Sequence, residues 1–224
     1  MAFYEIKVFT PDECHTAVEI LETFRKYWIS IPGKDVSDQY MFGRGLYTCG
    51  YEMHQYLLGA NHFNSHLLRQ FSWLYNKVFT ALEKVLGLPI QLTTEAGYPG
   101  FHIFESALPR GGMVHFDLQQ NFFPWTDKSK YDFSCPLSFT VALEVPSEGA
   151  ALNYWPNILG IENTKPIVHS EIGTPEKIQY RLGYMYFFNE LFLHQIGKKV
   201  SVEKRVTLQG HGLKFDQKYW SVYF

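Results

Sequence analysis

Residues 111–119, with the sequence GGMVHFDLQ, are the stretch on which the interpretation of this chain depends. A β-strand directs alternate side chains to the same face, so a strand here would point His115, Asp117 and Gln119 one way and the apolar residues between them the other. The stretch therefore predicts a strand near 112–118 that brings an imidazole and a carboxylate together.

A His-x-Asp pair is a weak signal by itself, because a chain with nine histidines produces such pairs by chance. A third ligand from a separate strand would complete a face of two histidines and one carboxylate. This arrangement leaves coordination positions open and suits non-haem Fe(II). His194, within Leu193-His194-Gln195, is the expected third ligand.

Residues 201–209 (SVEKRVTLQ) alternate in a way that is unusual for a core strand. Arg205, Thr207 and Gln209 share one face, and the opposite face is mainly apolar. If the polar face points into a barrel, the guanidinium needs an anionic partner. A carboxylate can accept two hydrogen bonds from it, and the hydroxyl two residues later can donate to the same group.

Taken together, His115-x-Asp117, His194 and Arg205-x-Thr207 resemble the Fe(II)/2-oxoglutarate-dependent oxygenases of the double-stranded β-helix superfamily. The resemblance implies that the two histidines and the aspartate bind iron. It also implies that the arginine and the threonine hold the distal carboxylate of 2-oxoglutarate.

The resemblance implies an α+β, mainly β fold: a double-stranded β-helix (jelly-roll) core with N-terminal helices packed on the outer sheet. It covers roughly residues 95–212, and the N-terminal third matches only as a helical preface. We therefore expect a single domain over residues 1–224, with a helical buttress at 1–90, the catalytic core at 91–212 and a C-terminal extension at 213–224.

The chemistry implied by the resemblance is that of an oxidoreductase that uses Fe(II), 2-oxoglutarate and O2. Such a dioxygenase converts 2-oxoglutarate to succinate and carbon dioxide and typically acts as a hydroxylase on an unactivated C–H bond. Related halogenases carry a small residue in place of the carboxylate ligand, so Asp117 favours hydroxylation, desaturation or demethylation. A small molecule, an amino acid or a peptide side chain is the expected substrate.

Two other classes of protein fit parts of the pattern. A cupin-type metal-dependent enzyme would not need 2-oxoglutarate, and Arg205-x-Thr207 argues against it. In a non-catalytic ligand-binding barrel, three converging ligands and an inward arginine would all have to be structural, which is unfavourable for buried charge. His169-x-Glu171 is a rival pair of metal ligands, but it leaves room for only one strand before His194. Arg181 is an alternative residue for binding a carboxylate if Arg205 faces outward.

Several further residues have two readings. His102 either lies near the cosubstrate or is a core histidine, and Gln119 either faces the site or satisfies backbone groups of the loop. Trp125 lies in the long loop after the ligand strand, where substrate selection is expected. Arg44 is either a substrate contact or a surface arginine, and His211, between two glycines, is interpreted as a turn residue.

Two amphipathic helices precede the β-rich region. The first begins with the capping box Thr10-Pro11-Asp12-Glu13 and ends before Pro32, and the second runs from residue 64 or 65 to 86. His62 is expected at or before the start of the second helix, as part of a solvated pair with His66. The eight predicted strands lie near 99–105, 112–118, 136–145, 150–155, 167–171, 182–188, 191–196 and 201–209.

The composition limits the classes of partner. A chain of 224 residues with 46 % hydrophobic residues can bury a full core. A net charge of -2 gives no electrostatic footprint for nucleic acid, and no apolar stretch is long enough to span a membrane. Three cysteines without CxxC spacing favour a reducing compartment, so we expect a soluble, cytoplasmic protein.

Overall fold

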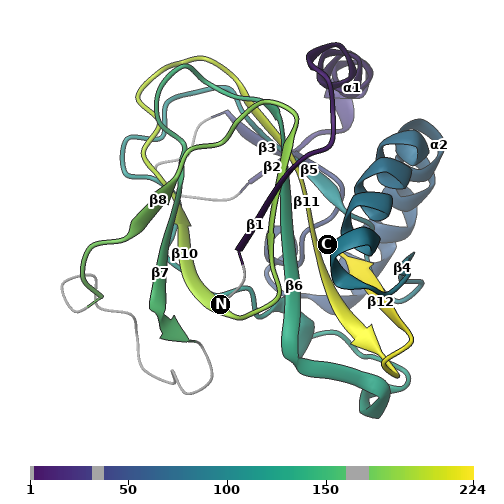
Figure 1. Ribbon diagram of the computed structural model, residues 1–224. Coiled ribbons are helices and arrows are strands. Elements are labelled where there is room, and N and C mark those ends of the chain that lie inside the picture. The colour runs from purple at the N-terminus through teal and green to yellow at the C-terminus, as the bar shows by residue number, and fades with distance from the viewer. Residues whose placement is uncertain (1–2, 32–37, 160–171) are drawn as a thin grey trace.

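The computed structural model describes residues 3–31, 38–159 and 172–224 and shows a mainly β protein with two α-helices (Figure 1). A nine-stranded sheet has the order β1-β9-β6-β11-β5-β3-β2, with β12 beside β11 and β4 beside β12, and a second sheet has the order β10-β7-β8. All the strand pairs are antiparallel except β12 with β4. In Figure 1 the large sheet lies between the small sheet and the helices.

The elements have the following bounds: β1 Phe3–Lys7, α1 Pro11–Thr23, β2 Ile29–Ser30, β3 Gln39–Phe42, α2 Met53–Leu86, β4 Ile90–Leu92, β5 Gly100–Phe104, β6 Tyr131–Glu144, β7 Leu152–Leu159, β8 Glu176–Ile178, β9 Tyr184–Phe188, β10 Phe192–Ile196, β11 Arg205–Phe215 and β12 Tyr219–Tyr223. Four short 3-10 helices cover Arg25–Tyr27, Leu46–Cys49, Gln119–Asn121 and Lys128–Lys130. The prediction of a mainly β chain with N-terminal helices is therefore confirmed.

The two faces of the large sheet have different roles. On β11, Val206 and Leu208 belong to the main hydrophobic core, which also contains Phe71 and Leu74 of α2. The alternate residues of the strand, beginning with Arg205, must point to the opposite face, toward the small sheet. Burial against the helices thus leaves one face of the sheet available for polar groups.

Helix α1 begins as its sequence predicts. The Thr10 hydroxyl accepts a hydrogen bond from the backbone N–H of Glu13, and the Glu13 carboxylate accepts one from the backbone N–H of Thr10. This capping box satisfies two N–H groups that the helix itself leaves unpaired. The helix ends at Thr23, earlier than the end just before Pro32 that the sequence predicts.

Helix α2 is longer than the sequence predicts, because it starts at Met53 rather than at residue 64 or 65. His62 lies inside the helix, and the expectation that it precedes the helix was wrong. Tyr56, Ala60 and Phe63 extend the buried stripe of the helix toward its N-terminus, and this burial outweighs the unfavourable helix propensity of Gly59. A Cβ at Gly59 would lie only 2.8 Å from the Arg44 Nε atom, so the Arg44 side chain packs directly across the helix.

The predicted strands agree with the structure in part. Strands were expected and are found near 99–105, 136–145, 150–155, 182–188 and 191–196, whereas the one near 167–171 lies outside the described residues. The expected strand at 201–209 begins at Arg205 and continues to Phe215, so His211 is a strand residue and not a turn residue. The C-terminal residues form β12, which pairs with β11 and β4.

Residues 111–119 do not form the regular strand that the sequence predicts near 112–118. His115 makes a single β-bridge, with His194. Gly111 has a φ of +75°, and a Cβ there would lie 2.6 Å from the carbonyl oxygen of Ile196. The chain therefore enters this stretch through a conformation that favours glycine, and pairing with β10 is limited to isolated contacts.

Within the part of the chain that the structure describes, neither helix is long and apolar enough to cross a bilayer.

Candidate metal centre

His115, Asp117 and His194 come together in space. One potential ligand atom from each lies within 4.8 Å of the others, and no other group of three such residues occurs among the residues described. Nε2 of His115 is 3.6 Å from Oδ1 of Asp117, and Nε2 of His194 is 3.6 Å from Oδ2 of the same carboxylate. Ligands that bind one ion at about 2 Å lie about 3 Å or slightly more from each other, so a small closing movement would accommodate an ion.

The backbone holds the two histidines beside each other. The N–H of His115 donates to the carbonyl of His194 at 3.0 Å, and the N–H of His194 donates to the carbonyl of His115 at 3.0 Å. The Gln195 side chain donates to the carbonyl of Gly112 at 2.7 Å and ties the irregular stretch to β10. The two imidazole centroids are consequently 4.4 Å apart.

Each histidine ring directs its Nδ1 atom toward the backbone carbonyl of the residue two positions earlier in the chain. Nδ1 of His115 is 2.9 Å from the carbonyl oxygen of Met113, and Nδ1 of His194 is 3.2 Å from the carbonyl oxygen of Phe192. A carbonyl oxygen can only accept, so each Nδ1 carries the proton and each Nε2 keeps its lone pair. Both lone pairs are therefore available to a metal ion.

The Asp117 carboxylate has two further polar neighbours that sequence reasoning did not assign to it. The Ser138 hydroxyl donates to Oδ2 at 2.7 Å, and Nδ1 of His211 lies 3.7 Å from the same oxygen. Burial by itself would raise the pKa of Asp117, but His194, His211, His115 and the Ser138 hydroxyl together hold that pKa below its usual value. Asp117 is therefore ionised and can serve as an anionic ligand.

Arg205 is a buried cation with no carboxylate partner among the described residues. Its residue exposure is 1 %, and its guanidinium lies near the rings of Phe104 and Tyr180. Nη1 donates to the Thr207 hydroxyl at 3.3 Å, whereas Nε and Nη2 have no hydrogen-bond partner. Burial lowers the pKa of Arg205, but a guanidinium remains charged. Such a group favours an anionic ligand.

The alternative carboxylate binder, Arg181, is already paired. Its Nε donates to a Glu5 carboxylate oxygen at 2.7 Å, and its side chain is 55 % exposed. Because Arg205 faces inward, Arg181 is not needed as a substitute.

His102 lies next to the Arg205–Thr207 end of the site. It pairs in register with Thr207 across β5 and β11, and its Nε2 is 2.6 Å from the hydroxyl of Tyr47. Burial, with a smaller contribution from Arg205, lowers the pKa of His102 to about 3. No sequence motif pointed to Tyr47, which lies in the short 3-10 helix Leu46–Cys49.

The neutral state of His102 leads to a prediction for stability. The unfolded chain takes up a proton on this residue near pH 6.5, whereas the folded chain resists until about pH 3. The contribution of neutral His102 to the free energy of unfolding is therefore complete above pH 6.5. Between pH 6.5 and pH 3 this contribution is lost by about 1.4 kcal/mol per pH unit as the pH falls. In chelator-treated protein, the free energy of unfolding measured with denaturant should fall more steeply between pH 7 and pH 4.5 for the wild type than for His102→Gln. Equal slopes for the two proteins would contradict this account of His102.

Trp125, expected to contact substrate, lies inside an aromatic cluster. It is 6 % exposed, packs against Phe123, Tyr131 and Tyr223, and donates from Nε1 to the carbonyl of Gln120. This environment explains the residue as part of the core.

Gln119 begins the 3-10 helix Gln119–Asn121 and is half-buried. The rival pair of metal ligands, His169 and Glu171, lies outside the described residues.

No protein-family model and no curated protein sequence matches this chain. Solved structures do match it. SnoN, a non-heme alpha-ketoglutarate-dependent epimerase of nogalamycin biosynthesis, is 14 % identical with a TM-score of 0.60, and the match covers 95 % of this chain and 78 % of SnoN. An N-substituted L-amino acid dioxygenase from Burkholderia ambifaria is 12 % identical with a TM-score of 0.59, over 99 % of this chain and 86 % of the other.

HygX from Streptomyces hygroscopicus, solved with nickel, 2-oxoglutarate and hygromycin B bound, is 14 % identical with a TM-score of 0.51, over 93 % of this chain and 82 % of HygX. The chain has the fold of these alpha-ketoglutarate (2-oxoglutarate) enzymes. The resemblance expected from the sequence is thus confirmed at the level of the fold, and the described residues include the His-Asp-His group.

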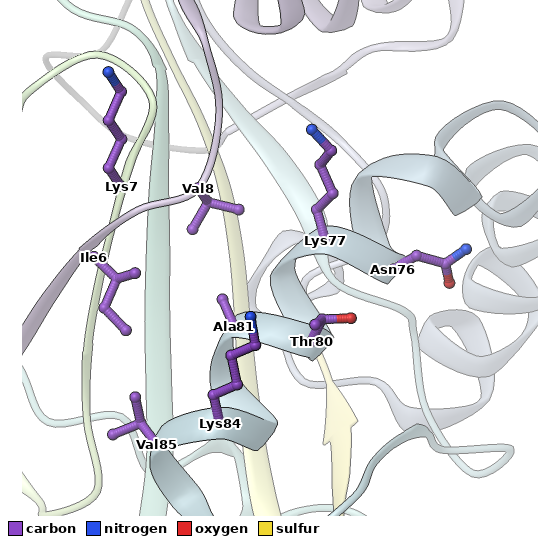
Figure 2. A pocket seen from close by; sticks show the side chains of 9 residues that line it. All are labelled: Ile6, Lys7, Val8, Asn76, Lys77, Thr80, Ala81, Lys84 and Val85. Carbon is purple, nitrogen blue, oxygen red and sulfur yellow. The ribbon is translucent and has the colours of Figure 1, made fainter.

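A separate groove of about 510 Å³ lies between β1 and α2 (Figure 2). Its lining includes Ile6 and Val8 at one side and Ala81 and Val85 of α2 at the other, with lysine side chains at its edge. It lies on the helical side of the large sheet, so it is distinct from the candidate metal centre on the opposite face.

Proposed function

We propose that this protein is a non-haem dioxygenase that depends on Fe(II) and 2-oxoglutarate. The observation that carries the proposal is a combination: a convergent His115–Asp117–His194 group and the buried guanidinium of Arg205, which has no carboxylate partner among the described residues. Together they offer the two kinds of partner that 2-oxoglutarate contacts, namely a metal ion and a cation for its distal carboxylate.

The donor set fits the metal. Two imidazole nitrogens and one carboxylate oxygen form the facial arrangement of non-haem Fe(II) oxygenases, which leaves positions open for other ligands. Both Nε2 atoms are held as lone-pair donors by the backbone carbonyls behind them. His115, Asp117 and His194 are therefore the proposed iron ligands. The nickel in HygX supports a divalent cation at such a site.

The environment of Arg205 fits the cosubstrate. Two of its guanidinium nitrogens lack partners, and the Thr207 hydroxyl lies beside it, so a carboxylate could receive hydrogen bonds from both residues. We assign Arg205 and Thr207 to the distal carboxylate of 2-oxoglutarate. His102 supports this end of the site as a neutral neighbour that adds no competing charge. A related dioxygenase structure holds alpha-ketoglutarate.

We infer that these two ends of the site face the same space between the two sheets. We infer that the nine-stranded and three-stranded sheets form a double-stranded β-helix within a single domain, with the ligands at β10 and the adjoining stretch and the arginine on β11. When bound, iron supplies the coupling of 2-oxoglutarate decarboxylation to O2 reduction. The residues of the chain bind the cosubstrate, fix its orientation and keep Asp117 ionised.

We infer that the substrate is a small molecule in the cytoplasm and that the reaction is hydroxylation of an unactivated C–H bond. The dioxygenase is named for N-substituted L-amino acids, SnoN comes from nogalamycin biosynthesis, and HygX was solved with hygromycin B bound. A carboxylate at position 117 favours hydroxylation over halogenation. A peptide side chain remains the second substrate class, and the proposal includes neither nucleic acid nor membrane partners.

The proposal is tested by titrating anaerobic protein with Fe(II) and 2-oxoglutarate and then admitting oxygen across a panel of amino acids, small metabolites and peptides. We expect slow succinate formation without substrate and a clear stimulation by at least one member of the panel, with product and succinate formed in equal amounts. His194→Ala serves as the inactive control.

Two outcomes would select the other classes. Bound metal and substrate turnover without any consumption of 2-oxoglutarate would indicate a cupin-type enzyme. Failure of the wild-type protein to bind metal would indicate a non-catalytic ligand-binding barrel.

A further inference from the structure

Ser138 and His211 form a polar pair behind the candidate metal ligand Asp117. The Ser138 hydroxyl is 2.7 Å from Oδ2 of Asp117 and 3.0 Å from Nδ1 of His211. Ser138 comes from β6 and His211 from β11, and the two residues are register partners in the large sheet. Both lie on the face opposite the main core, so the adjacent strands themselves set their separation.

The directions of the two hydrogen bonds follow from the donor count. A hydroxyl has one proton, and the ionised Asp117 carboxylate can only accept, so Ser138 donates to Oδ2. The remaining contact must then run from Nδ1–H of His211 to the Ser138 oxygen. The result is a relay in which the imidazole fixes the hydroxyl and the hydroxyl fixes the carboxylate.

This relay determines which oxygen of Asp117 is free. Both oxygens lie 3.6 Å from a histidine Nε2, Oδ1 from that of His115 and Oδ2 from that of His194, but Oδ2 also accepts the Ser138 proton, so Oδ1 keeps more of its lone-pair capacity for an ion. His211 cannot bind an ion through Nδ1 while that nitrogen donates to Ser138. The proposed function leaves both residues without a role, although both are largely buried beside the centre.

We propose that Ser138 and His211 are positioning residues that orient the Asp117 carboxylate so that it binds the metal through one oxygen. This inference rests on the proposed function, because it presumes an ion between His115, Asp117 and His194. Outer hydrogen bonds of this kind fix a ligand's orientation, and their loss typically weakens metal binding by about 10- to 100-fold.

The test measures Co(II) binding without 2-oxoglutarate, by calorimetry and by the visible d–d absorption of the bound ion. Ser138→Ala should weaken binding by about 10- to 100-fold and change the absorption spectrum, since a released carboxylate can bind through both oxygens. Ser138→Thr retains the hydroxyl and should keep the affinity and the spectrum close to wild type.

Thr140→Val is the matched control. Thr140 lies two residues further along β6 on the same face, and its hydroxyl accepts from the Gln209 side chain rather than touching Asp117. This variant loses a half-buried hydroxyl from the same strand but should retain wild-type Co(II) affinity. A purely structural role for Ser138 would lower the melting temperature of the metal-free protein and leave its Co(II) affinity and spectrum unchanged.

A double-mutant cycle tests the relay itself. His211→Phe keeps a ring against Tyr223 but removes the Nδ1 donor, and it should weaken Co(II) binding less than Ser138→Ala does. Because both residues act through one hydroxyl, the double variant should bind no more weakly than Ser138→Ala alone. Independent, multiplying effects would overturn the relay, as would wild-type binding by Ser138→Ala.

The outcomes separate this inference from the proposed function. If wild-type protein binds no Co(II), or if His194→Ala binds it equally well, the proposed metal centre itself is wrong. If the wild type binds and His194→Ala does not, while Ser138→Ala and His211→Phe match the wild type, only the positioning role is wrong.

Discussion

Succinate formation should be abolished by Asp117→Ala. The substitution removes the one carboxylate of the candidate centre and leaves Ser138 without its acceptor and His194 without its closest charged neighbour. Two imidazoles alone form a weaker and less selective site for Fe(II). The variant is assayed for succinate after oxygen exposure and for bound iron by elemental analysis.

The matched control for this variant is Asp127→Ala. The Asp127 side chain is 53 % exposed and pairs with Lys130 at the surface, so its loss should change neither iron content nor turnover. Turnover by Asp117→Ala at the wild-type rate would remove Asp117 from the metal centre, whatever the fold suggests.

The second large effect concerns Arg205. Arg205→Met keeps much of the buried volume but removes the guanidinium, so the distal carboxylate of 2-oxoglutarate loses its partner. Loss of one member of a buried charged pair costs about 2–5 kcal/mol, which corresponds to a roughly 30-fold or larger increase in the Kd for 2-oxoglutarate. Anaerobic titration of the iron-loaded protein with 2-oxoglutarate measures this change.

The same substitution should not destabilise the ligand-free protein. In the absence of an anion, Arg205 is a buried cation with two unpartnered nitrogens, and replacing such a group by an apolar one is neutral or stabilising. Thermal unfolding without 2-oxoglutarate should therefore give an unchanged or higher melting temperature. Arg181→Met, at the exposed pair with Glu5, is the control that should leave 2-oxoglutarate affinity unchanged. Wild-type affinity in Arg205→Met, or a large fall in its ligand-free stability, would contradict the assigned role.

The sequence predicted the candidate site better than the backbone that carries it. His115 and Asp117 were paired on the assumption of a strand, whereas the structure has one bridge to His194 and a left-handed Gly111. The two side chains still converge, with Nε2 of His115 3.6 Å from Oδ1 of Asp117, although no continuous ladder holds the stretch. Gly111 lies so close to the Ile196 carbonyl that regular strand pairing with β10 is interrupted there. This close approach depends on tertiary contacts, which the local sequence does not reveal.

For His211, the sequence prediction of the backbone conformation was wrong in the opposite direction, because a turn was predicted and a strand is found. Its two flanking glycines predicted a turn, yet they lie within β11. A Cβ at Gly210 would lie 2.5 Å from the ring of Phe139, its partner on β6, so this glycine makes room for an aromatic side chain across the strands. Cross-strand packing of this kind cannot be read from local sequence, and with it the pairing of His211 with Ser138 was missed.

Helix α2 was misjudged for a similar reason. Its first residues include Gly59 and several polar side chains, so local propensity placed the start too late. The contact between Gly59 and the Arg44 side chain gives that glycine a packing role. Capping of α1, by contrast, depends only on neighbouring residues, and the sequence predicted its start correctly.

The central claim is that one ion and one dicarboxylate bind side by side between the two sheets. A crystal structure of the protein grown with Mn(II) and 2-oxoglutarate under anaerobic conditions tests it most directly. We expect an ion bound by Nε2 of His115, Nε2 of His194 and one oxygen of Asp117, with the distal carboxylate of 2-oxoglutarate on Arg205 and Thr207. An ion held elsewhere, or 2-oxoglutarate bound without contact to Arg205, would contradict it.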